Sequence, residues 1–140
     1  MSRIFWDTNL FIYLFEDYGG LSQRVADIRQ RMLDRADELF TSTLTLGEIL
    51  VKPLEAGNTG LKTRYEEAIV RSATLLPLSR DAAVRYAEIR LDRSIRAPDA
   101  VQLACAAEAR IDLFVTNDER LAAKTVRGIH FIQSVERAFL

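Results

Sequence analysis

The chain carries the stretch IFWDTNLFI at residues 4–12, in which a carboxylate separates two apolar runs. Residues 4–6 have the continuous apolar character of a strand that is buried on both faces. Asp7 ends this run, and the apolar pattern resumes at Leu10. A carboxylate directly after so apolar a strand needs either a structural partner or a function.

Four further apolar runs follow along the chain, and longer segments of helical period separate them. The predicted strands are Arg3–Trp6, Leu39–Ser42, Thr74–Leu78, Leu113–Thr116 and Ile129–Ile132. The predicted helices are Leu10–Phe15, Leu21–Asp37, Leu46–Ala56, Leu61–Ser72, Arg80–Leu91, Pro98–Arg110, Glu119–Lys124 and Val135–Phe139. This alternation predicts an α/β fold in which a five-stranded parallel sheet carries helices on both faces.

Length and composition predict one domain over residues 1–140. The chain is long enough for a sizeable core, and no repeat or linker divides it. No apolar stretch approaches the roughly 18 residues of a membrane span, and the first residues lack the features of a signal peptide. We therefore expect a cytoplasmic protein without membrane association. The net charge of −1 gives no global basic signature of nucleic-acid binding.

Four acidic residues lie where predicted strands lead into helices. Asp7 follows the first strand, Glu48 lies early in the helix after the second, and Asp118 lies just past the fourth. Asp99 opens the alanine-rich helix. Ligands of parallel sheets bind at the carboxyl ends of the strands. We therefore expect these four carboxylates to converge at one edge of the sheet.

Each of these acids, taken alone, also has a structural explanation. Asp7 can cap the following helix, and Thr45/Glu48 and Thr116/Glu119 have the spacing of a capping box. Asp99 falls in a first helical turn, where the helix dipole favours a carboxylate. Only the joint pattern of four acids indicates a functional site.

Carboxylates that converge would repel one another unless a cation lay between them. Oxygen ligands without a neighbouring His or Cys suit Mg²⁺ or Mn²⁺ better than zinc. Such a site can activate water and stabilise charge on a phosphodiester. The only histidine, His130, has no Ser or Cys partner signal, and the chain has no Gly-rich phosphate loop.

The stretches FWDTNLFI, TSTLTLGEIL, RAPDAVQLACA and LFVTNDERL, in this order, resemble the PIN domains, and among them the VapC-type toxins of toxin–antitoxin pairs. The resemblance covers nearly the whole chain. It implies a PIN-like α/β fold with an acidic pocket, and the activity of an endoribonuclease that depends on Mg²⁺ or Mn²⁺.

The resemblance also assigns roles to individual residues. It implies that Asp7 and Asp99 are the primary metal ligands and catalytic residues. Glu48 and Asp118 would complete the acidic set, directly or through water. Thr116 and Asn117 would shape the loop after the fourth strand.

Two further expectations concern RNA and protein partners. Arg93 and Arg96, just upstream of the third acid, are the candidates for RNA binding nearest the predicted pocket. Leu10–Phe15 and Leu21–Leu33 offer more apolar surface than one small sheet needs, which predicts a homodimer. The resemblance also implies a homodimer, and a small antitoxin protein whose tail enters the pocket.

Competing functions stay open at this point. A haloacid-dehalogenase-like phosphatase needs a second Asp two residues after the first, where this chain has Asn9. A response-regulator receiver needs a phosphorylatable Asp on a middle strand, and Leu75–Leu78 offers none. A PIN-like binding module without catalysis is a further alternative. A toxin and a housekeeping nuclease fit the sequence equally well.

Overall fold

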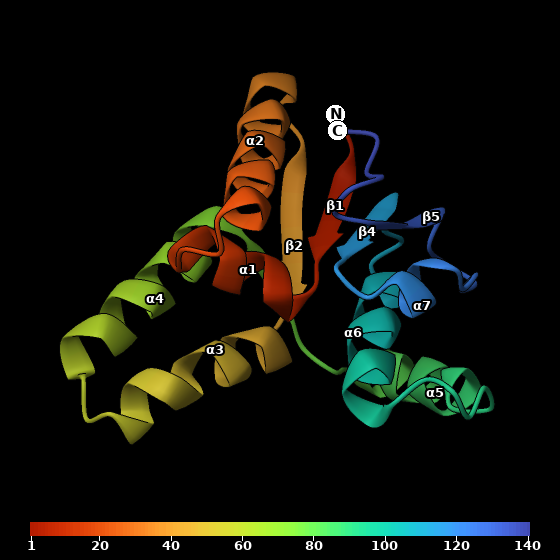
Figure 1. Ribbon diagram of the computed structural model, residues 1–140. Coiled ribbons are helices and arrows are strands. Elements are labelled where there is room, and N and C mark those ends of the chain that lie inside the picture. The colour runs from red at the N-terminus through yellow and green to blue at the C-terminus, as the bar shows by residue number, and fades with distance from the viewer.

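A five-stranded parallel sheet forms the centre of the protein in the computed structural model, which describes residues 1–140 (Figure 1). Its strands are β1 (Arg3–Trp6), β2 (Glu38–Ser42), β3 (Thr74–Leu76), β4 (Leu113–Thr116) and β5 (Phe131–Ser134). They lie in the order β3-β2-β1-β4-β5, and each neighbouring pair is parallel. The predicted fold class is therefore confirmed.

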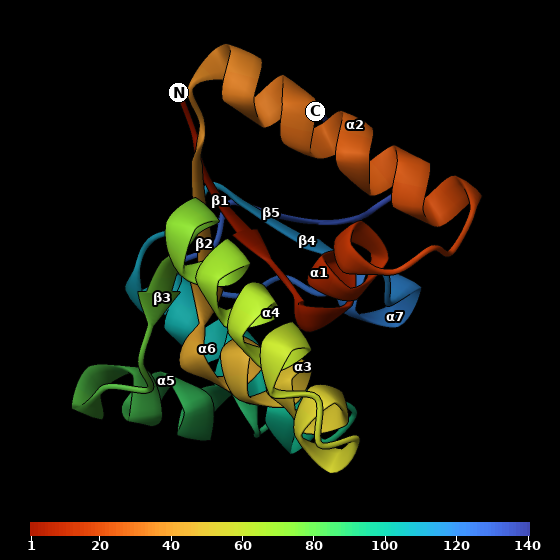
Figure 2. The same ribbon diagram turned by 90° about the vertical axis from the view of Figure 1, so that its left-hand side faces the viewer.

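Seven helices surround the sheet in two groups (Figures 1 and 2). They are α1 (Thr8–Phe15), α2 (Gly20–Arg35), α3 (Thr43–Glu55), α4 (Thr59–Ser72), α5 (Arg80–Ile89), α6 (Ala97–Glu108) and α7 (Glu119–Ala122). The first four helices contribute to the apolar core on one face of the sheet, and the last three to the core on the other. None of these helices has the length and apolar composition that crossing a bilayer requires.

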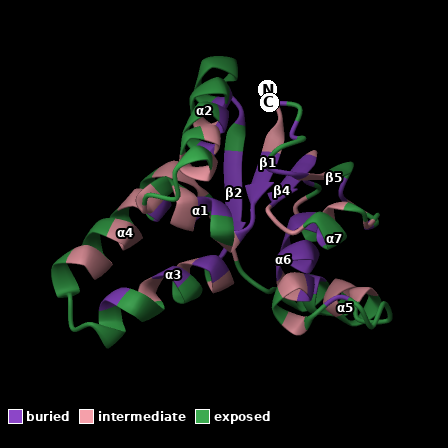
Figure 3. Cartoon of the chain, viewed as in Figure 1, coloured by how far each residue is buried: buried purple, intermediate pink, exposed green.

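The position of β1 in the middle of the sheet explains why its sequence is continuously apolar. Side chains alternate between the two faces of a strand, so Ile4 and Trp6 enter the first core and Phe5 enters the second. All three are fully buried, as Figure 3 shows for the middle of the sheet. Phe5 stacks on Phe114 of β4, with 4.9 Å between the ring centroids and 8° between the planes. This packing fixes β1 and β4 as neighbours.

Two predicted elements near the C-terminus were wrong. The last strand is not Ile129–Ile132 but β5, two residues later, because Phe131 pairs with Leu113 of β4. The predicted helix Val135–Phe139 is absent. That segment instead lies against α2, where Arg24 Nε donates a 3.2 Å hydrogen bond to the Val135 carbonyl. The other elements begin and end within three residues of the prediction.

The apolar segments on which a dimer interface was predicted are largely used within the chain. Leu10 and Phe11 of α1 are fully buried, as are Val25 and Ile28 of α2. Leu14 and Leu33 are exceptions, with 36% and 55% of their surface exposed. These segments therefore supply the first core rather than a spare apolar surface.

Candidate active site

Asp7 is both a helix cap and a buried acid. Its Oδ1 accepts a 2.8 Å hydrogen bond from the Thr8 backbone N–H, and its Oδ2 accepts one of 2.8 Å from the Thr116 hydroxyl. Burial raises the pKa of the Asp7 carboxyl; the bonds from Thr116 and Thr8 lower it, whereas the nearby charges of Asp99 and Glu48 raise it further. The surroundings thus disfavour the charge of Asp7, on balance.

Asp7 and Asp118 follow the two neighbouring strands at which the order of the sheet reverses. The chain runs outward from β1 through β2 to β3, and then returns to β4 on the other side of β1. Ligand sites of open parallel sheets lie at the carboxyl ends of such strands. Thr116, the last residue of β4, joins the two acids: its hydroxyl donates to Asp7 and accepts from the Asp118 N–H at 3.1 Å.

Asp118 caps the short helix α7. Its Oδ1 accepts hydrogen bonds from the backbone N–H groups of Arg120 at 2.9 Å and Leu121 at 3.4 Å. The alternative in which Thr116 and Glu119 form a capping box is therefore not what the structure shows. The Thr116 hydroxyl is left to hold Asp7 instead.

Glu48 lies in the second turn of α3, inside the helix rather than at its cap. The N-cap of α3 is Ser42, whose hydroxyl oxygen accepts a 3.3 Å hydrogen bond from the Thr45 N–H. Thr45 and Glu48 therefore do not form a capping box. Glu48 Oε1 instead accepts a 2.7 Å hydrogen bond from the Thr8 hydroxyl. This bond joins the acid of α3 to the residue that follows Asp7.

A buried glutamine extends this connection. Gln102 of α6 is only 2% exposed, and its Nε2 donates to Thr45 Oγ1 at 2.7 Å and to Thr8 Oγ1 at 3.1 Å. Its Oε1 accepts a hydrogen bond from the Ser42 hydroxyl. The polar network therefore fixes α1, α3 and α6 relative to one another at the site.

The sequence reasoning missed Gln102, although two signals were present. It is the one polar side chain in the apolar run VQLACAA, and it lies three residues after Asp99. Residues three apart share a helix face, so Gln102 had to point toward the acids or into the core.

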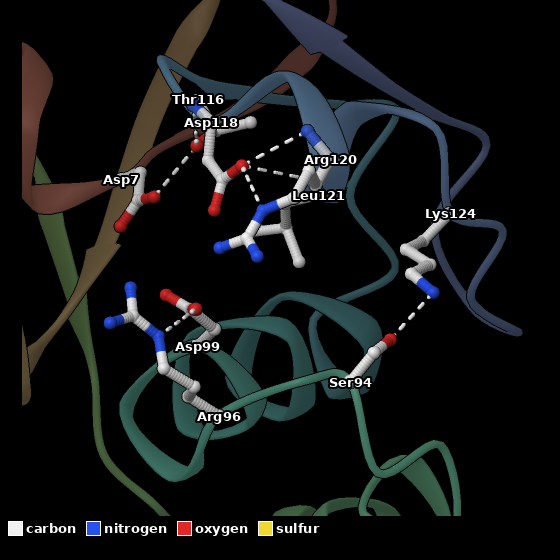
Figure 4. Close-up of polar contacts among 9 residues, drawn as sticks. All are labelled: Asp7, Ser94, Arg96, Asp99, Thr116, Asp118, Arg120, Leu121 and Lys124. Carbon is white, nitrogen blue, oxygen red and sulfur yellow. Dashed lines mark hydrogen bonds and ion pairs between the residues drawn. The ribbon is translucent and has the colours of Figure 1, made fainter.

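Asp99 lies in the first turn of α6, after Pro98. Its Oδ2 is 3.7 Å from the Arg96 Nε, and Arg120 Nε is the same 3.7 Å from Asp118 Oδ1. Burial raises the pKa of the Asp99 carboxyl; Arg96 and Arg120 lower it, while Asp118 raises it further. Figure 4 shows Asp7, Asp99 and Asp118 around a common space, with the two arginines beside it.

All four predicted acids line two adjoining cavities. The acidic cavity, of about 400 Å³, is lined by Asp7, Glu48 and Asp99, together with Thr8, Gln102 and Arg96 among others. The middle cavity, of about 390 Å³, is lined by Asp99 and Asp118, together with Ser94, Ile95, Arg120, Leu121, Ala123 and Lys124. Asp99 belongs to both cavities.

The donor set fits a hard divalent cation in its chemistry. Four carboxylates and no His or Cys line the two cavities, and oxygen ligands of this kind suit Mg²⁺ or Mn²⁺. No three acidic, His or Cys side chains are close enough together, as they lie, to hold an ion. Arg96 and Arg120, which pair with Asp99 and Asp118, have 73% and 81% of their side chains exposed. Such exposed ion pairs are worth about 0–1 kcal/mol, so a cation can displace them at little cost.

The remaining predicted site residues occupy the edges of the site. Asn117 Nδ2 donates a 2.8 Å hydrogen bond to the Tyr13 hydroxyl, which ties the loop after β4 to α1. Arg96 lines the acidic cavity. Arg93 is exposed and lines neither the acidic nor the middle cavity.

Several solved structures share this fold. VapBC2 from Rickettsia felis, bound to a DNA fragment from its promoter, superposes with a TM-score of 0.75 at 12% identity, covering 94% of this chain and 98% of that one. DNA-bound VapBC from Salmonella typhimurium superposes with a TM-score of 0.72 at 20% identity, covering 96% of this chain and 99% of that one. A toxin–antitoxin complex from Klebsiella pneumoniae superposes with a TM-score of 0.65 at 22% identity, covering 90% of this chain and 94% of that one.

Two comparisons used the sequence alone. No curated protein matches the chain significantly. The family model of the PIN domain, however, matches residues 4–126. This range includes all four acids and all but the last strand. The chain therefore belongs to the PIN domain family.

Proposed function

We propose that this protein is an endoribonuclease that depends on Mg²⁺ or Mn²⁺, and that it is the toxin of a toxin–antitoxin pair. One observation carries the nuclease assignment: Asp7, Glu48, Asp99 and Asp118 line adjoining cavities at the carboxyl ends of β1 and β4. The pKa values of Asp7 and Asp99 support it: burial raises both and neighbouring carboxylates raise them further, and a bound cation would stabilise the ionised carboxylates.

The chain's own residues would divide the work as follows. Asp7 and Asp99 would hold the metal, with Glu48 and Asp118 contributing directly or through water. When bound, the metal would activate a water molecule and offset the charge that develops on the phosphate. The Thr116 hydroxyl keeps Asp7 in one orientation, and the Thr8 hydroxyl does the same for Glu48. Water adds to the phosphorus, and the bond to one bridging oxygen of the RNA breaks.

Three further parts of the proposal concern the partners of the protein and its location in the cell. The structural neighbours named above are toxin–antitoxin complexes, which supports a small antitoxin as the partner of this chain. We also propose a homodimer, as the resemblance of the sequence to the VapC-type toxins implies. A toxin whose substrate is RNA would act in the cytoplasm, and none of the seven helices could cross a membrane.

The test of the nuclease assignment is cleavage of single-stranded RNA by wild type, Asp7→Asn and Asp99→Asn, with Mn²⁺ and with a chelator. We expect metal-dependent cleavage by wild type and none by either variant, because an amide supplies no negative charge to hold a cation. Both variants should fold, because Asn caps α1 about as well as Asp7 does, and Asp99 loses only its pairing with the exposed Arg96.

Asp37→Asn is the matched control. Asp37 is 9% exposed and Asp7 is 8% exposed, but Asp37 precedes β2 and therefore lies at the opposite edge of the sheet. Its substitution should leave cleavage intact. Cleavage retained by Asp7→Asn and Asp99→Asn would refute the assignment. A wild type that neither cleaves RNA nor binds Mn²⁺ would indicate the alternative, a PIN-like binding module without catalysis.

A further inference from the structure

A third cavity continues the line of the first two. This outer cavity, of about 250 Å³, has Arg85, Lys124 and Arg127 among its lining residues. It shares Ile95 and Lys124 with the middle cavity, which in turn shares Asp99 with the acidic cavity. The three cavities therefore adjoin one another in a series that starts at the acids.

Lys124 stands at the boundary between the middle and outer cavities. Its Nζ donates to Asp92 Oδ2 at 2.9 Å and to Ser94 Oγ at 2.8 Å, so it bridges the end of α7 and the loop before α6. Figure 4 shows this side chain reaching across to Ser94. An ammonium group has three N–H donors. Lys124 therefore keeps one donor for a ligand on the path.

The charges favour this path over the alternative exit from the acidic cavity. Beyond the metal-binding acids, the middle and outer cavities carry four cations against two acids; the cations are Arg85, Arg120, Lys124 and Arg127. The groove on the other side of Glu48 is mostly apolar and carries one cation, Lys52, against Glu16. A polyanion is attracted to the first surface and gains nothing on the second.

We propose that single-stranded RNA, on one side of the scissile phosphate, runs from the acidic cavity through the middle cavity to the outer cavity, where Arg120, Lys124 and Arg127 contact its phosphates. This inference rests on the nuclease function proposed above. The path also accounts for RNA binding by a chain of net charge −1, because the cations are concentrated where the strand passes.

The test is fluorescence anisotropy with a labelled oligouridylate of about twelve nucleotides, a length that single-strand grooves cover. All variants carry Asp7→Asn, which removes cleavage without altering the middle or outer cavity. We expect Lys124→Ala and Arg127→Ala each to raise Kd about fivefold. Each should also reduce the slope of log Kd against log salt by about 0.7, the value for one phosphate contact on a single strand.

Lys62→Ala provides a closely matched control. Lys62 Nζ lies 2.8 Å from Glu66 Oε1, with 32% and 40% of the two side chains exposed. Lys124 lies 2.9 Å from Asp92, with 32% and 41% exposed. Lys62 is on α4, away from the path, so its loss should leave Kd and the salt slope unchanged.

A second variant separates a phosphate contact from a merely structural role of Lys124. Asp92→Asn weakens the bridge to the loop but keeps the cation, so it should leave RNA binding unchanged or strengthen it. If Asp92→Asn weakens RNA binding as much as Lys124→Ala does, the proposed contact is wrong. It is also wrong if Lys124→Ala and Arg127→Ala leave RNA binding unchanged, as Lys62→Ala should. If wild type binds RNA with the expected pattern but does not cleave it with Mn²⁺, the nuclease function fails and the path stands.

Discussion

The Thr8 hydroxyl donates a 2.7 Å hydrogen bond to Glu48 Oε1, and so joins two acidic residues 41 positions apart through the side chain that follows Asp7. A single hydroxyl group thus sets the position of the α3 carboxylate relative to the end of β1. The geometry of the acidic cavity depends on this bond, and its removal can be tested directly.

Thr8→Val keeps the shape of the side chain but removes the hydroxyl group. We expect RNA cleavage to slow by about ten- to hundredfold, because small displacements of a catalytic group are costly. The melting temperature should fall only modestly, because Gln102 Nε2 loses Thr8 Oγ1 as an acceptor but keeps Thr45 Oγ1. Thr8→Ser keeps the donor and should restore most of the rate. Equal rates for Thr8→Val and wild type would show that Glu48 is positioned without this bond.

Gln102→Leu should destabilise the protein by about 1–3 kcal/mol, the cost of leaving buried polar groups without partners. The hydroxyls of Ser42 and Thr45 lose their bonds to Gln102 in this variant. Urea unfolding measures the difference. Gln30→Leu is the control, because Gln30 is exposed on α2 and bonds only to Asp34; its effect should be within a few tenths of a kcal/mol.

The stability of the metal-free protein should rise as the pH falls from neutral. Burial raises the folded-state pKa of Asp7 and Asp99 above the ordinary value of 3.8, so each group binds its proton more readily when folded. Such groups destabilise the fold while ionised, and this cost disappears as the pH falls through their folded-state pKa. Asp7→Asn should be more stable than wild type at neutral pH and should show a weaker pH dependence of unfolding.

At lower pH the trend should reverse. The bond from Ser94, followed by that from Lys124, lowers the pKa of Asp92 to about 2. The stability that this exposed acid contributes is present above its unfolded value of 3.8 and is lost as the pH falls toward 2. Urea unfolding in the absence of metal should therefore show a maximum on the acidic side of neutral. A steady fall in stability from neutral pH downward would contradict the expected effect of Asp7 and Asp99.

Mn²⁺ should raise the melting temperature of wild type, because a ligand that binds only the folded state stabilises it by mass action. The gain is about 2.7 kcal/mol when the ion is present at a hundred times its Kd. Asp99→Asn should lose most of this gain, and Asp37→Asn should keep it. Equal stabilisation of all three proteins would mean that Mn²⁺ binds elsewhere.

The sequence was sufficient to predict the central part of the fold. The strands β1 and β4 are buried on both faces, so their apolar runs are unbroken and their limits are as predicted. The positions of the four acids follow from the ends of such elements. Their convergence depends only on the parallel direction of the strands, which the alternation of strands and helices already indicated.

The errors lie where long-range pairing decides the structure. The limits of β5 follow from its register with β4, and a short apolar run does not contain this information. The segment after β5 has enough apolar residues for a helix, yet Arg24 and Arg31 of α2 bind its carbonyl groups instead. Ser42 and Asp118 form the caps of α3 and α7, so the capping-box spacing of Thr45/Glu48 and Thr116/Glu119 has no structural counterpart.

The position of Thr116 has a consequence for spectroscopy. Its side chain is fully buried, and its single hydroxyl proton points at Asp7 Oδ2 over a 2.8 Å donor–acceptor distance. A proton shielded from bulk water in this way exchanges slowly and is observable by NMR. Its chemical shift would report the charge of the Asp7 carboxylate from inside the sheet. The protein thus contains its own reporter of ion binding, and no label needs to be placed in the active site.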